Sequence, residues 1–185
     1  MTEQTATSIR GKKIILRPFR LEDADPMWDS IDNEEVNKLT GTHDDFTREQ
    51  IDGYIKKQVA ADDESRVAFI IALPDDSRAL GEVVINEIDR DNNAASIRIA
   101  LFENRDFGQG YGTEAMKLMV NHGFTVLNLH RIELTVYAFN PRAIRAYEKA
   151  GFTKEGVMRE MLHWDGNYID GIIMSVLAHE WQALS

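Results

Sequence analysis

The stretch FGQGYGTEA at 107–115 has the residue types and spacing best suited to binding a phosphorylated molecule. Three glycines, Gly108, Gly110 and Gly112, alternate between a predicted strand and a predicted helix that Thr113 opens. Glycines leave backbone N–H groups unobstructed, and a helix N-terminus adds unpaired N–H groups and partial positive charge. The stretch therefore predicts a phosphate site.

Three other interpretations of the glycines are a tight turn, a dinucleotide fingerprint and a Walker loop. The glycines could form only a tight turn. A dinucleotide fingerprint needs a third small residue, but Thr113 stands there when the count starts at Gly108, and three predicted strands come first. Glu133 lies at the spacing of a ribose-binding acid, but inside its predicted strand. No Gly-Lys-Ser/Thr follows, which excludes a Walker loop.

The segment resembles the phosphate-binding motif Arg/Gln-x-x-Gly-x-Gly/Ala of the GNAT acyl-CoA N-acetyltransferases. Gly110 and Gly112 match its two small positions, whereas Phe107 replaces the Arg or Gln. In this family an aromatic residue at that position is common in the branch that acts on protein N-termini and small amines. The departure therefore indicates a subgroup of the family.

Two downstream segments carry the same resemblance. Residues 140–152, NPRAIRAYEKAGF, are similar to the family segment Asn-x-x-Ala-x-x-x-Tyr-Glu-Lys-x-Gly-Phe. Residues 158–170 resemble the hairpin of the ribosomal-protein N-terminal and spermidine acetyltransferases. In element order the resemblance extends from about Lys12 to Trp181.

The resemblance implies acetyl-CoA as co-substrate, no metal, and direct attack of an amine on the thioester. The diphosphate would bind the loop amides, and the pantetheine arm would fill a gap between two splayed strands. Backbone N–H groups near the end of the first splayed strand would bind the arm and polarise the thioester carbonyl. The implied cofactor-binding residues are Leu101, Phe102, Glu103, Phe107, Gly108, Gln109, Gly110, Tyr111, Gly112, Thr113, Asn140, Arg142 and Ala143.

Tyr147 is the candidate catalytic acid that protonates the departing thiolate. A tyrosine with a pKa near its usual value of about 10 is protonated at neutral pH and can donate. By spacing alone, Tyr147 and Ile144 would be core residues on one helix face. The family resemblance favours the catalytic role. Asn140 caps the same helix, and Pro141 follows at its first position.

The general base is not evident from the sequence. Many family members place a glutamate on the strand before the phosphate loop, but that neighbourhood reads Ala94-Ala95-Ser96 here. Another family position for a glutamate corresponds to Thr135. A relay through solvent is the default expectation. Four further candidates are Glu82, Glu87, His163 and Asp170.

Two acceptor classes remain open. The hairpin and Phe107 favour a protein or peptide N-terminus, which is the first expectation. The segment GFTVLNLH at 123–130 is similar to spermidine acetyltransferases and favours a polyamine or another small amine. Acidic clusters at 34–35, 44–45 and 62–64 could hold a polycation, although solvated surface acids are the simpler interpretation.

A non-catalytic acyl-CoA sensor is the alternative from another class. The absence of a base at the usual positions favours a sensor, and the presence of Tyr147 opposes it.

The elements that must position these residues form a mixed α/β pattern. The resemblance implies a GNAT-type α+β fold, with a mostly antiparallel sheet of about seven strands, flanked by helices and splayed at the fourth and fifth strands. We expect a flexible tail at 1–10 and a single domain at 11–185. Strands are predicted at 13–17, 67–73, 80–88, 95–102, 131–139, 158–164 and 168–177, and helices at 21–31, from 47, at 113–128 and from 141.

Composition excludes several classes of protein. The 185 residues include no cysteine, which rules out disulfides and thiolate chemistry and fits a cytoplasmic protein. No apolar run is long enough to cross a membrane. The net charge of −10 argues against nucleic acid as a partner. No pattern indicates the oligomeric state, and a homodimer is left open.

Overall fold

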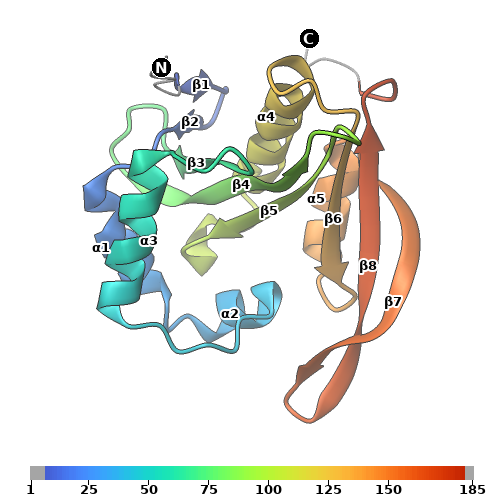
Figure 1. Cartoon of the computed structure of the whole chain (residues 1–185). Helices are drawn as coiled ribbons and strands as arrows, with labels where there is room; N and C mark the ends of the chain where they lie inside the picture. Colours follow the sequence, from blue (N-terminus) through green and yellow to red (C-terminus); the bar gives the residue numbers. More distant parts are fainter. Residues whose placement is uncertain (1–6, 182–185) are drawn as a thin grey trace.

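The computed structural model describes residues 7–181, which form one mixed sheet with helices on both faces (Figure 1). The eight strands lie in the order β1-β2-β3-β4-β5-β6-β8-β7. Neighbouring strands are antiparallel except β5 and β6, which are parallel. The strands are β1 Ile9–Arg10, β2 Ile15–Arg17, β3 Val67–Ala72, β4 Ala79–Asp89, β5 Ala94–Leu101, β6 Arg131–Tyr137, β7 Thr153–Trp164 and β8 Asn167–Leu177.

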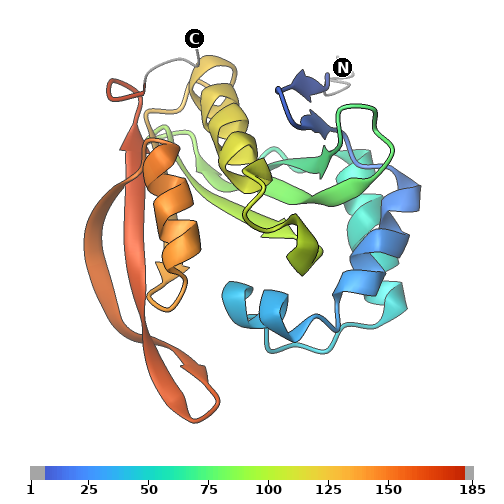
Figure 2. The same cartoon turned by 180° about the vertical axis from the view of Figure 1, so that it is seen from behind.

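The helices divide between the two faces of the sheet. In Figure 1, α1 and α3 cover the front of the β2–β5 side, and Figure 2 shows α4 and α5 on the back. A smaller helix, α2, lies below the ends of β5 and β6. The helices are α1 Ala24–Ser30, α2 Glu34–Thr40, α3 Arg48–Ala60, α4 Tyr111–Thr125 and α5 Pro141–Lys149, with 3-10 turns η1 Leu21–Asp23 and η2 Asn104–Asp106.

Alternation along the strands builds a separate apolar layer on each face. On the back, Ile97 of β5 and Ile132 of β6 are buried in the same cluster as Met116 of α4. On the front, Ile70 of β3 packs in a second cluster with Ile55 of α3. Because successive side chains point to opposite faces, Ser96, Arg98 and Ala100 of β5 face the front.

The sheet is split between β5 and β6. These strands pair only at Ala94↔Arg131, Ala95↔Ile132 and Ser96↔Glu133, and beyond Ser96 no pairing joins them. By contrast, β6 pairs with β8 from Arg131 to Tyr137. The predicted splay is therefore present. It closes at Ser96 and opens toward Leu101.

Three features differ from the sequence prediction. The sheet has eight strands rather than about seven, because Ile9 and Arg10 pair with Leu16 and Ile15. The ordered sheet thus begins inside the predicted tail, whose residues 1–6 lie outside the described part. Helix α2 was not predicted from the sequence, although Asn33 caps its first turn and Gly41 ends it with φ of 70°.

The remaining differences are shifts of boundaries. The predicted helix at 21–31 consists of η1 followed by α1, and the long helix starts at Tyr111 rather than Thr113. Strand β7 begins at Thr153, five residues before the predicted start at 158. Within residues 7–181, no helix is long and apolar enough to span a membrane.

Candidate active site

The glycine loop joins the open end of the splay to the N-terminus of α4. Gly108 and Gly110 have φ of 74° and 85°, in the left-handed region that favours glycine. Gly110 is the N-cap of α4, and the N–H groups of the first helical turn have no acceptor within the helix. A Cβ atom on Gly108 would meet nothing within 4 Å, so packing does not require this glycine. The positive φ of the loop and the access that a missing side chain gives to the amides account for a glycine at position 108.

Lys13 adds a positive charge to this loop. This residue was not among the site residues predicted from the sequence. Its Nζ donates a hydrogen bond of 2.9 Å to the carbonyl oxygen of Gln109. The same atom lies 3.2 Å from the position of a Cβ atom on Gly110. The backbone N–H groups of Lys12 and Lys13 donate to Glu114 of α4, at 2.6 and 2.8 Å, which fixes this turn against the helix. An ammonium group is thus held beside the predicted phosphate site.

Phe107 holds a second cation at the loop. The Arg142 guanidinium lies 4.1 Å from the centroid of the Phe107 ring, a cation–π contact. Arg142 also lies 3.7 Å from a Glu35 carboxylate oxygen at the start of α2. The residue that departs from the family motif therefore positions a positive charge supplied by α5.

A cavity connects the loop, the end of β5 and α5. Most of the predicted residues line this cavity, and the side chains of Phe102, Glu103, Gln109 and Tyr111 lie outside it. The predicted residues in the lining are Leu101, Phe107, Gly108, Gly110, Gly112, Thr113, Asn140, Arg142, Ala143 and Tyr147.

One of the predicted amide donors at the end of β5 is already hydrogen-bonded within the sheet. The Phe102 N–H donates to the Leu80 carbonyl oxygen at 2.9 Å, so it is engaged within the sheet. Because successive N–H groups point to alternate edges of a strand, those of Leu101 and Ile99 point toward the splay. Ile99 also lines the cavity and was missed. Glu103 forms ion pairs with Arg78 and Arg105.

Tyr147 lies on α5 and lines the cavity. Its ring centroid is 6.2 Å from that of Phe152, and the residue packs against the core on the back of the sheet. Burial raises the pKa of Tyr147 to about 12, so the phenol stays protonated at neutral pH. The side chain thus packs against the core, as its spacing predicts, and also lines the cavity, while its catalytic role stays a prediction.

The cap of α5 positions this part of the wall. Asn140 is buried, and its side-chain oxygen accepts a hydrogen bond of 3.1 Å from the Ala143 N–H. Pro141 occupies the first helical position. The predicted cap is therefore present, and it holds Asn140 in the cavity lining.

Glu82, one of the candidate bases, is engaged on the front face. Its side chain is only 7% exposed, and it forms an ion pair of 2.8 Å with Arg98, which is 49% exposed. The Tyr54 hydroxyl donates to Glu82 at 2.7 Å. Burial, followed by the charge of Glu82, raises the pKa of Tyr54, so Tyr54 acts as a neutral donor. This carboxylate is held by two donors.

Glu87 is the second candidate base on β4. The Ser96 hydroxyl of β5 donates a hydrogen bond of 2.6 Å to its carboxylate. Two other candidates belong to the β7–β8 hairpin: His163 packs on Tyr168 with ring centroids 4.8 Å apart, and Asp170 accepts from the Glu160 N–H. Only Glu82 and Glu87 come from a strand adjacent to β5.

The front of the splay carries more negative than positive charge. Glu133 and Glu155 both form ion pairs with Arg131, at 2.7 and 2.5 Å. Together with Glu82, Glu87 and Arg98, and with Arg66, which contacts the Tyr54 hydroxyl, these residues place four carboxylates and three guanidinium groups on this face. The balance of these groups favours a cationic ligand.

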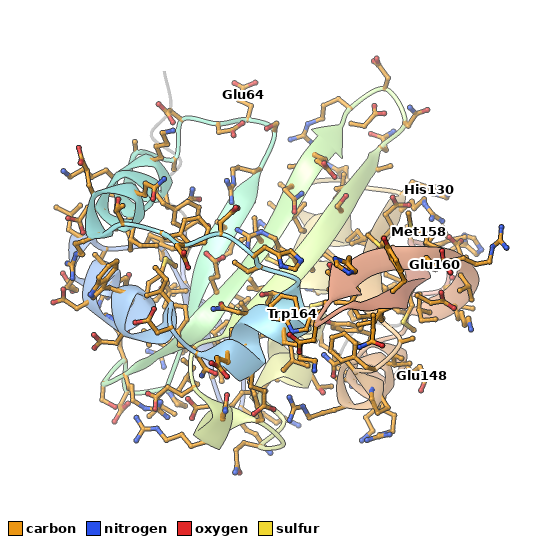
Figure 3. The ribbon with its side chains drawn as sticks, turned by 90° about the horizontal axis from the view of Figure 1, so that it is seen from below. Glu64, His130, Glu148, Met158, Glu160 and Trp164 are labelled. Carbon is orange, nitrogen blue, oxygen red and sulfur yellow. The ribbon has the colours of Figure 1, made fainter. Side chains whose placement is uncertain are left out.

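Helix α2 and the hairpin approach each other below this face. His43, which follows α2, packs against Trp164 of β7 with the rings tilted and their centroids 4.7 Å apart. Lys38 of α2 lies 5.7 Å from the centroid of the Phe139 ring and 4.0 Å from Asp165. Figure 3 shows Trp164 beside α2, whereas Glu64, from the acidic cluster at 62–64, lies at the outer edge.

Among the residues that the structure describes, no group of three or more His, Asp or Glu side chains could hold a metal ion.

The chain matches the family model described as an acetyltransferase (GNAT) domain, over residues 13–153. It is 30% identical over 173 residues to the uncharacterized N-acetyltransferase p20 of Bacillus licheniformis, covering 92% of this chain and 96% of that one. It is 33% identical over 121 residues to the spermidine N(1)-acetyltransferase of Escherichia coli K12, covering 65% and 63%.

The fold is similar to that of the Vibrio cholerae spermidine N-acetyltransferase, whose crystal structure contains CoA and spermine. The TM-score is 0.83 at 23% identity, over 92% of this chain and 98% of the other. An acetyltransferase of the GNAT family from Bacillus anthracis gives a TM-score of 0.80 at 21% identity, over 94% and 99%.

Proposed function

The chain belongs to the GNAT acetyltransferase family and is an acetyl-CoA-dependent N-acetyltransferase; from this premise we propose that its acceptor is a small polycationic amine. The observation that carries the proposal is the charge of the front face, where four glutamates, Glu82, Glu87, Glu133 and Glu155, outnumber three arginines. The spermidine acetyltransferases among the relatives support the same acceptor class.

We assign the two sides of the splay different tasks. On the back, the first-turn amides of α4 would bind the diphosphate, with Lys13 and Arg142 adding positive charge. The Ile99 and Leu101 amides, which point into the splay, would hold the arm. The acceptor would approach from the front.

Tyr147 would complete the transfer from the back. The amine lone pair attacks the thioester carbonyl carbon, a C–N bond forms, and the C–S bond breaks with its electron pair on sulfur. The Tyr147 hydroxyl would then give its proton to sulfur. A phenol with a pKa raised to about 12 holds its proton over the working pH range, so it is available to donate to the sulfur as negative charge develops there.

A protein or peptide N-terminus is the second candidate acceptor. The observation that favours it is Arg98 of β5, which lies two positions before Ala100. Its half-exposed guanidinium faces the front of the sheet. A guanidinium can bind the carbonyl oxygens that follow a peptide N-terminus.

The experiment is thiol release from acetyl-CoA with purified protein and a panel containing spermidine, spermine, a monoamine and short peptides, with products identified by mass. We expect mono-acetylated spermidine or spermine with the highest kcat/KM. Preferential acetylation of the peptide α-amine would replace the polyamine proposal with the second candidate. Tight CoA binding with no acetylated product from any acceptor would instead indicate a sensor.

A further inference from the structure

The splay has a closed end that fixes where a reactive group would lie. Beyond Ser96↔Glu133 the two strands separate, and the glycine loop follows the open end of β5. Leu101 lies five positions after Ser96, about 17 Å along the extended strand. An arm that enters from the loop and runs between the strands therefore points its reactive end at Ser96 and Glu133, which we call the apex.

The backbone of β4 is distorted beside the apex. The register with β5 shifts between Asn86 and Asp89, and Glu87 within this bulge has φ of 55°. A left-handed conformation is unfavourable for a glutamate, and bulges near active sites commonly redirect a side chain. Here the bulge brings the Glu87 carboxylate within 2.6 Å of the Ser96 hydroxyl.

The other front-face carboxylates are held by cations. Arg98 pairs with Glu82, and Arg131 pairs with both Glu133 and Glu155. A carboxylate bound to a guanidinium is a weaker proton acceptor, because the cation stabilises its charged form. The hydrogen bond to Glu87 comes instead from a neutral hydroxyl, that of Ser96 at the apex.

We propose that Glu87, acting through the Ser96 hydroxyl, accepts the proton that the acceptor ammonium must lose before it attacks. This inference rests on the proposed function, because it concerns the same reaction. A primary alkylamine has a pKa near about 10, so at neutral pH it arrives protonated. The front face thus supplies a base opposite Tyr147, which lies on the back.

The acceptor nitrogen loses two protons during the transfer. The ammonium gives one proton to the Ser96 oxygen while the Ser96 hydroxyl proton moves to the Glu87 carboxylate, which later releases it to solvent. The nitrogen lone pair then forms the C–N bond. The nitrogen loses its second proton after attack, and this loss compensates the proton that Tyr147 gives to sulfur. Net release is one proton for each acetyl group transferred.

The test compares Glu87→Gln with wild type on spermidine, or on the panel's best alkylamine, at several pH values. We expect kcat/KM to fall about 100-fold at pH 7 with acetyl-CoA affinity unchanged. The deficit should shrink as pH approaches the pKa of the amine, because a neutral amine needs no base. A deficit equal at pH 7 and at about pH 10 would indicate a structural role and overturn the proposal.

Other charged and titratable groups near Glu87 also affect the pH dependence of kcat/KM. Those on the same face are Arg66 from the segment before β3, Tyr54 on α3, Glu82 on β4, Arg98 on β5, Arg131 with Glu133 on β6, and Glu155 on β7. Each is present in both proteins, so the ratio of variant to wild type isolates Glu87.

Two further variants keep the result decisive. Ser96→Ala removes the hydroxyl without altering the bulge residue, and we expect a loss of about tenfold with the same pH pattern, because water can replace part of the relay. Glu49→Gln is the matched control, since Glu49 is exposed at the start of α3 and belongs to none of the acidic clusters. Its kcat/KM should equal that of wild type.

Each outcome decides between the claims. Wild-type rates from Glu87→Gln on an amine that wild type acetylates would overturn the role of Glu87 and leave the proposed function standing. If Glu87→Gln does not fold, a wild-type profile from Ser96→Ala would overturn the relay. If wild type acetylates no amine, the proposed function fails and the role of Glu87 fails with it.

Discussion

The back and the front of the β5–β6 splay are built by different means. On the back, the site consists of backbone groups and caps from two short stretches, the loop into α4 and the start of α5. On the front, side chains from β4, β5, β6, β7 and α3 are brought together by strand register. The back thus offers a set of backbone amides that most substitutions leave unchanged, whereas single substitutions can change the charge of the front.

This difference matches the chemistry expected of each side. Every acetyl donor in this reaction carries the same diphosphate and arm, so a backbone cradle is sufficient. Acceptors differ in charge and length, and side chains can discriminate between them by a few charged groups. Substitutions on the back should therefore affect the donor, and those on the front the acceptor or the stability of the sheet.

The largest effect is expected at Gly110. Gly110→Val places a β-branched side chain at φ of 85°, against Lys13 Nζ, and disturbs the first-turn amides. Losing two hydrogen bonds to a charged diphosphate costs about 3 to 6 kcal/mol, which is more than about 100-fold in Kd for CoA. Calorimetric titration with CoA measures this loss, and Gly53→Val, at an open position on α3, is the control. An unchanged Kd for CoA in a folded Gly110→Val protein would show that the loop does not bind the acetyl donor.

The second effect concerns Tyr147. Tyr147→Phe removes the hydroxyl but keeps the ring against Phe152, so we expect kcat to fall about tenfold or more with acetyl-CoA affinity retained. Steady-state kinetics with a separate CoA titration distinguish the two quantities. Tyr168→Phe, at an exposed tyrosine, should retain wild-type kcat. An undiminished kcat in Tyr147→Phe would remove Tyr147 from the mechanism.

A smaller effect is expected on the front, in stability. Arg98→Met leaves the buried Glu82 carboxylate without its nearest cation, although Tyr54 still donates to it. We expect a loss of about 1 to 3 kcal/mol in the free energy of unfolding, because a buried charge loses a partner. Urea unfolding at pH 7 measures it. Equal stability of Arg98→Met and wild type would show that the pair does not hold the front face together.

The smallest effect concerns the exposed pair Arg131–Glu155. The hydrogen bond from Arg131, with a second from Ser175, lowers the pKa of Glu155 to about 2. A depressed folded pKa gives stability that is present above the unfolded value of about 4.3 and lost as pH falls toward 2. Because both side chains are partly exposed, the contribution should not exceed about 1 kcal/mol.

Unfolding of wild type and Arg131→Met at pH 7 and pH 3 tests this linkage. The difference between the two proteins should be present at pH 7 and smaller at pH 3. A difference that grows at pH 3 would contradict the sign.

The back could be predicted from the sequence because its signals are local. Gly108 and Gly110 before a helix, with Gly112 in its first turn, and Asn140-Pro141 at another helix start, determine conformation within a few residues. The resemblance then implied a splay between two strands, and the pairing of β5 with β6 confirms it.

The front could not be predicted because it depends on register and irregularities. Nothing in the sequence marks Glu87 as a bulge residue that meets Ser96, and Arg98 and Glu82 meet only through the β4–β5 pairing. Lys13 was missed for the same reason, since it reaches Gln109 across 96 positions. Helix α2 has cap signals at Asn33 and Gly41, but it is short.

The most direct measurement is a crystal structure with acetyl-CoA bound. The account predicts the diphosphate on the amides following Gly108, the arm between β5 and β6, and the thioester between Tyr147 and the Ser96–Glu87 pair. A donor bound elsewhere, or one whose acetyl group points away from the closed end of the splay, would contradict it.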